Sequence, residues 1–197
     1  MGKKVVRLHL QELILAIAVR FCYRVQKYLR GMNIALVAHD ARKPELLDWV
    51  KYNYKELSKH KLFATGTTGK LIGKIYIGEA KSGHIDDGEW EYDYEDVEFP
   101  FKNITPLLSG PLGGDGQIGA MIAEGKIDCL IFFCDNLITQ GHYQDVGALS
   151  RLASLYNIPF ATNRTTADMI LTSPLFNNPD YVRIIPKAIE NYTNRNL

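Results

Sequence analysis

Residues 107–115 read Leu-Leu-Ser-Gly-Pro-Leu-Gly-Gly-Asp, and this stretch places the end of an apolar strand directly before a glycine-rich turn. Three glycines within five residues let the backbone bend tightly and approach a ligand closely. Asp115 stands where the next helix begins, which suits a group that acts on a bound ligand but is also the usual place of a helix cap. The stretch predicts a strand–turn–helix unit, with Asp115 as the first candidate for chemistry.

Apolar runs of strand length alternate with helical segments along the rest of the chain. The expected strands are 33–38, 61–64, 104–108, 128–133 and 159–162. The expected helices are about 44–60, 117–124, 145–156, 167–171 and a terminal helix from Lys187, with a short strand at 182–185. This alternation predicts an α/β fold with a doubly wound, mainly parallel five-stranded sheet and helices on both faces.

The amino-acid composition favours a soluble globular protein over a membrane-spanning or nucleic-acid-binding one. A chain of 197 residues with 46% hydrophobic and 23% charged residues is typical of one soluble domain, and a net charge of +1 gives no field that would attract nucleic acid. The three cysteines Cys22, Cys129 and Cys134 are odd in number and lack CxxC spacing, which favours a reduced, cytoplasmic protein. The apolar run at 13–19 is too short to cross a bilayer.

Two additions flank or interrupt the predicted domain, which covers residues 32–197. Residues 1–31 hold seven Lys or Arg against one Glu, a net +6, and their apolar positions recur at helical spacing. This segment predicts an amphipathic helix that packs on protein, and contact with an anionic membrane surface is the less favoured alternative.

The second addition, at 78–102, is acidic: over 79–98 it holds nine Asp or Glu against one Lys, a net −8. A solvated loop or a short hairpin is expected, and the alternation of Trp90, Tyr92 and Tyr94 suits the hairpin. No calcium-loop spacing is present, so a metal site is not expected there. The opposite charges predict that the two additions touch, within or between subunits.

Polar side chains follow each of the five predicted strands. In chain order these exits carry His39 and Asp40; Thr65, Thr67 and Thr68; Ser109, Gly110 and Asp115; Asp135 and His142; and Asn163. Because the carboxyl ends of parallel strands meet at one edge of the sheet, these groups are expected to form one rim. Hydroxyl groups beside helix starts suit phosphate, and the several titratable groups favour an active site over a plain binding module.

Several longer motifs resemble those of the methylglyoxal synthase family. They are IALVAHD at 34–40, ATGTTG at 64–69, LSGPLGGD at 108–115, EGKID at 124–128, and then NIP, ATN and TAD at 157–159, 161–163 and 166–168. The resemblance runs from about residue 33 to the carboxyl end, without the acidic insertion. It implies an enzyme that converts dihydroxyacetone phosphate to methylglyoxal and inorganic phosphate, with no metal or organic cofactor, usually as a homohexamer.

The resemblance also implies roles for residues. Asp115 matches the catalytic base, His142 the group that polarises the carbonyl, and Asp145 an acid that orients groups or relays protons. Asp40 matches a further catalytic acid. The binding residues implied for the substrate and its phosphate are His39, Lys43, Thr65, Thr67, Thr68, Ser109, Gly110, Asp135 and Arg195, the last reaching a neighbouring subunit's site. Inorganic phosphate is expected to inhibit as well as to be released.

One departure and two alternatives stand beside this interpretation. Many family members have prolines in the loop that corresponds to 135–145, and this chain has none, which predicts a less pre-organised loop. The same fold serves as the effector-binding domain of carbamoyl phosphate synthetase and as part of a purine-synthesis cyclohydrolase, so fold alone does not give function. The joint presence of Asp115, His142 and Asp145 favours the synthase.

Overall fold

A five-stranded parallel sheet forms the centre of the chain. In a computed structural model, the structure describes residues 31–75, 80–86, 89–94, 101–137 and 143–195. The sheet order is β5-β2-β1-β6-β7, and every neighbouring pair is parallel. The strands are β1 (Asn33–Ala38), β2 (Lys61–Ala64), β5 (Ile104–Pro106), β6 (Cys129–Phe133) and β7 (Phe160–Ala161). The chain steps outward from β1 to β2 and β5, then crosses to β6 and β7, so the winding reverses between β1 and β6.

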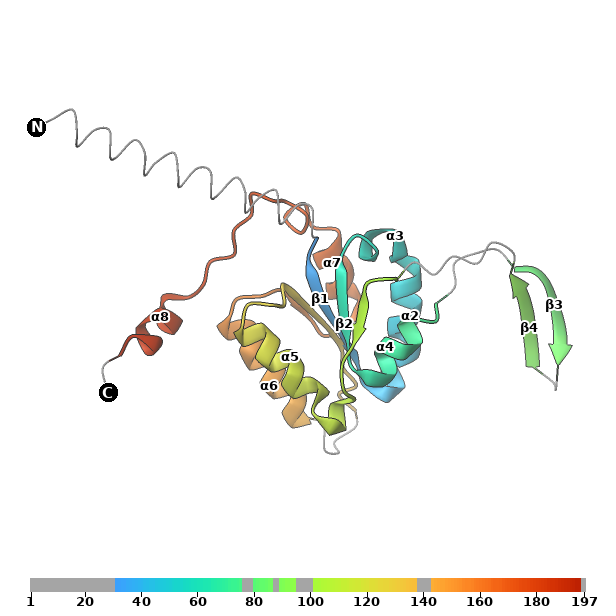
Figure 1. The fold of residues 1–197 in the computed structure, drawn as a ribbon, viewed down its shortest axis with the longest axis horizontal. Coiled ribbons are helices and arrows are strands. Elements are labelled where there is room, and N and C mark those ends of the chain that lie inside the picture. Colours follow the sequence, from blue (N-terminus) through green and yellow to red (C-terminus); the bar gives the residue numbers. More distant parts are fainter. Residues whose placement is uncertain (1–30, 76–79, 87–88, 95–100, 138–142, 196–197) are drawn as a thin grey trace, which may run out of the picture.

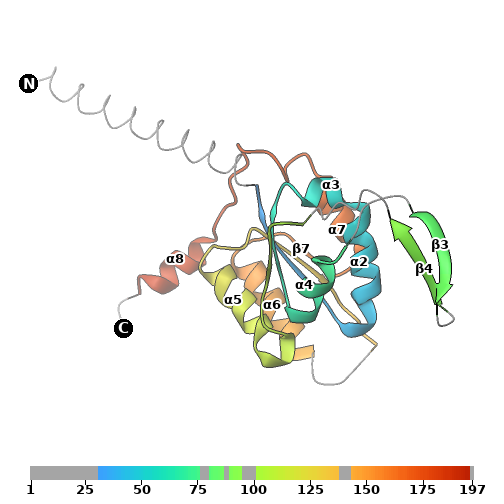
Figure 2. The same ribbon diagram turned by 45° about the vertical axis from the view of Figure 1, so that its right-hand side comes forward.

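Helices cover both faces of this sheet (Figures 1 and 2). Helices α2, α4 and α7 contribute buried side chains to the core on one face, and α5 and α6 to the core on the other. Their bounds are α2 (Lys43–Tyr52), α3 (Tyr54–Leu57), α4 (Gly66–Ile72), α5 (Gly114–Ala123), α6 (Tyr143–Leu155), α7 (Arg164–Leu171) and α8 (Lys187–Thr193), with 3-10 turns η1 (Asp40–Arg42) and η2 (Gly110–Leu112).

The residues of the central strand β1 explain why helices must cover both faces of the sheet. Ile34, Leu36 and Ala38 belong to the core under α2, whereas Ala35 and Val37 belong to the core under α5 and α6. Successive strand residues point to opposite faces, so a strand that is apolar at every position is stable only with protein on both sides. The predicted α/β class and the five strands are confirmed.

Two local predictions were wrong. The helix expected at 44–60 is broken at Asn53, which leaves helical geometry (φ −98°, ψ 17°) while its backbone N–H and side-chain Nδ2 both donate to the Trp49 carbonyl at 3.0 Å. The strand expected at 182–185 has no ladder partner within the described chain, and Val182 and Ile184 are exposed. Apolar spacing signals a strand locally, but a ladder needs a second strand at the right distance.

The acidic insertion forms a hairpin apart from the main sheet. Strands β3 (Ala80–Asp86) and β4 (Glu89–Tyr94) pair antiparallel in a two-stranded sheet of their own, which confirms the hairpin reading (Figure 1). The insertion leaves the domain after Ile75 and returns at Phe101, and both of these side chains pack in the core under α2.

The helix predicted at 1–31 lies outside the described residues except for Gly31, as do Cys22 and the expected contact between the two additions. Within the described chain, no helix has both the length and the apolar character needed to cross a membrane.

Candidate active site

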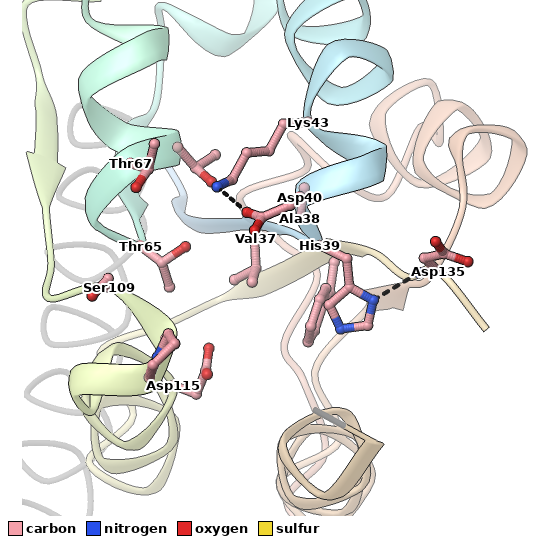
Figure 3. A pocket seen from close by; sticks show the side chains of 14 residues that line it. Val37, Ala38, His39, Asp40, Lys43, Thr65, Thr67, Ser109, Asp115 and Asp135 are labelled. Atoms are coloured by element: carbon pink, nitrogen blue, oxygen red, sulfur yellow. Dashed lines mark hydrogen bonds and ion pairs between the residues drawn. The ribbon is translucent and has the colours of Figure 1, made fainter. Parts of the chain in front are cut away.

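A pocket of about 500 Å³ lies where β1, β2, β5 and β6 end (Figure 3). Ten of the thirteen predicted site residues line it: His39, Asp40, Lys43, Thr65, Thr67, Thr68, Ser109, Gly110, Asp115 and Asp135. They are separated by up to 96 positions in sequence, and the parallel sheet brings them together because it aligns the strand exits at one edge. Their presence in one pocket is an observation, and their individual roles stay predictions.

The turn between β2 and α4 provides hydroxyl groups. Thr65 has an extended backbone (φ −62°, ψ 145°) and stands immediately before α4, with Thr67 and Thr68 in the first turn. The Thr68 side chain is 1% exposed, and its Oγ1 makes no hydrogen bond to the part of the chain that the structure describes. A buried hydroxyl without a partner costs on the order of 1–3 kcal/mol, and Thr68 carries that cost at the edge of the pocket.

The turn after β5 can be built only with glycine at two positions. Gly113 has φ +100°, in the left-handed region, and a Cβ on Gly114 would lie 2.0 Å from the carbonyl oxygen of Leu108. The Leu112 and Gly114 amides both donate to the Ser109 carbonyl at 3.0 Å, which closes the turn. Asp115 is thereby fixed in the first turn of α5.

The two turns are packed directly against each other. The Gly66 amide donates to the Leu108 carbonyl at 3.0 Å, and a Cβ on Gly66 would lie 2.9 Å from the Ser109 nitrogen. On the other side, a Cβ on Gly110 would lie 2.8 Å from the Asp115 Oδ2, so the carboxylate rests against the turn itself. The hydroxyl-bearing turn and the acid-bearing helix therefore share one surface.

Lys43 brings a cation to the pocket. Its Nζ pairs with Asp40 Oδ1, three residues earlier across η1. The Lys43 side chain is 19% exposed whereas that of Asp40 is 94% exposed, so the lysine is the more buried partner of the pair that Figure 3 shows. A partly buried ammonium group beside hydroxyl groups favours an anionic ligand such as phosphate.

His39 is held in one orientation and, when neutral, in one tautomer. Its Nδ1 accepts the backbone N–H of Asp135 at 2.8 Å, and its ring packs edge-on to Phe132 with centroids 5.1 Å apart. Because Nδ1 is the acceptor, the proton of the neutral ring lies on Nε2. The Asp135 carboxylate accepts the N–H of Leu137 at 3.0 Å. This pair spans the ends of β1 and β6, where the winding reverses and ligands typically bind.

A thiol lies just behind the pocket but does not suit nucleophilic chemistry. Cys134 is buried at the end of β6, and its Sγ donates to the carbonyl of Phe132 at 3.2 Å. Burial raises the pKa of the Cys134 thiol to about 11, with Arg42 opposing the shift. The thiol is therefore protonated at neutral pH, and a thiolate is not available.

Three predicted residues are not placed in the pocket. His142 lies outside the described residues; Asp145 is in the first turn of α6, and only its backbone is described. Arg195 follows α8 and is exposed, with its guanidinium carbon 3.7 Å from the centroid of the Tyr192 ring, and it does not line the pocket.

A fourth expectation is corrected. Asn163, at the exit of β7, does not line the pocket; its Oδ1 accepts the N–H of Thr166 at 2.9 Å and caps α7.

The sequence reasoning missed the apolar wall. Val37, Ala38, Phe132 and Pro111 also line the pocket. The first three are the closing residues of β1 and β6 and were interpreted only as core. Their position in the sequence could have indicated this role, because the last residues of a parallel strand adjoin the edge of the sheet where ligands bind.

Comparisons with known proteins agree on one family. A family model described as "MGS-like domain" matches residues 45–162. A methylglyoxal synthase of Maridesulfovibrio salexigens is 53% identical over 144 residues, covering 73% of this chain and 85% of the relative. A methylglyoxal synthase of Proteus mirabilis is 50% identical over 152 residues, covering 77% and 84%. The crystal structure of methylglyoxal synthase from Elizabethkingia anophelis NUHP1 matches with a TM-score of 0.65 and 42% identity, covering 84% of this chain and 92% of that one.

Proposed function

The chain belongs to the methylglyoxal synthase family, and we propose that its carboxyl-end pocket converts dihydroxyacetone phosphate to methylglyoxal and inorganic phosphate. The observation that carries the proposal is the combination of a hydroxyl-lined turn, a partly buried lysine and the Asp115 carboxylate in one pocket. A phosphate-binding module needs the first two features, and the reaction also needs a base.

The phosphate lies on the hydroxyl-lined turns. Thr65, Thr67, Thr68 and Ser109 supply hydroxyl donors, Gly110 supplies a close backbone approach, and Lys43 supplies the opposing charge. Lys43, paired with Asp40 in this structure, turns its charge toward the phosphate.

Asp115 removes the proton. Its carboxylate rests against Gly110, so it lies beside the phosphate-binding turn. Transfer of that proton breaks a carbon–hydrogen bond next to the ketone and leaves an ene-diolate. A base positioned by a rigid helix start avoids the entropy of a freely moving one.

The ene-diolate oxygen needs hydrogen-bond donors. His142 is assigned this role from the family resemblance, with Asp145 orienting it. Asp40 and Asp135 complete the acidic surroundings, with no separate proton transfer assigned to either.

The outcome depends on how the phosphate is held. The ene-diolate loses phosphate readily when the carbon–oxygen bond to phosphate lies perpendicular to the ene-diolate plane, because the breaking bond then overlaps the π system. The electron pair of the ene-diolate forms the new double bond, phosphate leaves as an anion, and the enol tautomerises to methylglyoxal. Inorganic phosphate fits the same turns and should inhibit.

Assembly is part of the proposal. Arg195 lies outside the pocket, so it would reach a substrate only in a neighbouring copy, as in a homohexamer. Exposed apolar residues in the segment before α8, such as Val182 and Ile184, support an interface there. The buried, unpaired thiols of Cys129 and Cys134 suit a cytoplasmic enzyme.

The deciding experiment incubates the purified chain with dihydroxyacetone phosphate and measures methylglyoxal and inorganic phosphate. Equal amounts of both products, with inhibition by added phosphate, are expected. Phosphate binding without turnover would overturn the synthase and support an effector-binding domain. For the assembly, sedimentation should give a hexamer, and Arg195→Ala should raise KM; unchanged kinetics would remove Arg195 from the site.

A further inference from the structure

The backbone of Leu108 joins the two halves of the pocket. Its carbonyl oxygen accepts the amide of Gly66, at the start of α4, at 3.0 Å. Its amide donates to the side-chain Oε1 of Gln117, on α5, at 2.9 Å. The α4 side carries the threonine hydroxyl groups and the α5 side carries Asp115. The backbone of Leu108 is thus hydrogen-bonded both to the threonine-bearing turn and to the helix that carries Asp115.

Gln117 does not face the substrate. It is two residues beyond Asp115 on the same helix, and residues two apart point to different sides of a helix. Asp115 lines the pocket, whereas Gln117 is exposed and is not among the lining residues. Its side chain turns back to the residue that follows β5 by two positions.

The bond from Gln117 differs from the other ties of this turn. The bonds from Leu112 and Gly114 to the Ser109 carbonyl close a local loop between residues five or fewer apart. The bond from Gln117 spans nine residues and links the body of α5 to the strand end. It ties the body of α5 to the segment after β5, in addition to the local bonds that close the turn.

We propose that Gln117 is a positioning residue of the synthase reaction, which holds Asp115 in register with the phosphate by anchoring α5 to the backbone of Leu108. The inference rests on the proposed function. Removing the acceptor leaves the Gly66–Leu108 bond in place, so the phosphate-binding turns keep their shape. What changes is the distance between the bound phosphate and the base, and misplacement of a base lowers the rate of the chemical step.

The hydrogen bond between Gln117 and Leu108 is exposed to solvent. Its loss can therefore change the reaction rate without a large change in the stability of the fold. Water can satisfy the Leu108 amide once the side chain is removed, so the folded chain loses little stability. A structural role would show in the melting temperature and in phosphate binding. A positioning role shows in kcat alone.

The test compares Gln117→Met, which keeps the length of the side chain without the acceptor, with Gln117→Glu, which keeps an acceptor oxygen. The matched control is Thr172→Val, which removes another exposed side-chain bond to backbone, from Thr172 Oγ1 to the Asp168 carbonyl at 2.7 Å, outside the pocket. For each protein, kcat and KM for dihydroxyacetone phosphate, the inhibition constant of inorganic phosphate and the melting temperature are measured.

Gln117→Met should lower kcat about fivefold, the effect of about one net hydrogen bond, with the phosphate inhibition constant within about twofold of wild type. Gln117→Glu should stay within about twofold of wild type in kcat, and Thr172→Val should match wild type. The proposal is overturned by wild-type kcat in Gln117→Met, by equal losses in the Met and Glu variants, or by a parallel loss of phosphate binding. No turnover in the wild-type protein would overturn the synthase assignment, and the positioning role with it.

Discussion

The two ends of the sheet carry cavities of similar size and different chemistry. The carboxyl-end pocket encloses about 500 Å³ and the amino-end groove about 450 Å³. The first is lined by hydroxyl groups, carboxylates and a lysine, whereas the second is lined largely by apolar side chains such as Met32, Ile158, Phe176 and Ile185. The two cavities therefore differ in the chemistry of their lining and hardly in volume, and the lining is the basis of the proposed site.

The difference follows from the direction of the strands. At the amino ends, polar side chains hydrogen-bond to the backbone of neighbouring segments. Asp128 Oδ2 accepts the Asn33 amide at 2.9 Å, and His60 Nδ1 accepts the Met32 amide at 3.1 Å. At the carboxyl ends, the chain enters helices whose first amides lack helical partners, and threonine and serine hydroxyl groups line the pocket beside them. The comparison predicts that substitutions at one end change chemistry and at the other change stability.

The largest effect should come from Asp115→Asn. The amide keeps the shape of the side chain but cannot take the proton, so kcat should fall by about a thousandfold or more, within the range for loss of a general base. Phosphate inhibition should persist, because the hydroxyl-lined turns are intact. Full activity in this variant, measured by methylglyoxal release, would remove Asp115 as the base.

At the amino end, Phe176→Ala should act on stability. Phe176 is 6% exposed and packs edge-on to His60 with centroids 5.4 Å apart. Truncation of a buried Phe costs about 3–5 kcal/mol of unfolding free energy, measured by denaturant titration, and KM should stay near wild type. Tyr52→Ala, at a 79% exposed aromatic residue, is the control that should leave stability unchanged. A loss of phosphate binding in folded Phe176→Ala would break the separation of the two ends.

Thr68→Val should weaken phosphate inhibition about tenfold, since the hydroxyl is replaced by a methyl group of the same size. Because that hydroxyl is buried without a partner among the described residues, the substitution should not lower the melting temperature. Thr68→Ser keeps the hydroxyl and should keep most of the affinity. If Val and Ser variants bind phosphate equally well, Thr68 is a packing residue.

The smallest effect should be the pH dependence of stability from His60. Burial lowers the pKa of His60 below its ordinary value, against the raising influence of Glu56. The unfolded chain therefore binds the proton more readily, so this contribution to stability is present above about pH 6.5 and is lost as the pH falls below it. Denaturant titrations between pH 7.5 and 5.5 should show the loss, and His60→Gln should flatten it. An equally steep curve in His60→Gln would assign the dependence to other groups.

Much of the fold and site was predictable because the signals are local and repeated. The apolar run of β1 and the glycines before Asp115 each determine one element, and a parallel sheet then places all strand exits at one edge. The break at Asn53 was missed because it is a departure of one residue from helical backbone geometry, which apolar spacing does not reveal. Gln117 was missed because its significance lies in its partner, Leu108, nine residues away and on another element.

The anchoring of the insertion by Ile75 and Phe101 has a consequence for protein engineering. Both residues pack in the core under α2, so the span between them closes a loop whose ends are already fixed by the domain. The entropy of closing such a loop grows only slowly with its length. We therefore expect the domain to accept segments of different length between Ile75 and Phe101 at little cost in folding free energy.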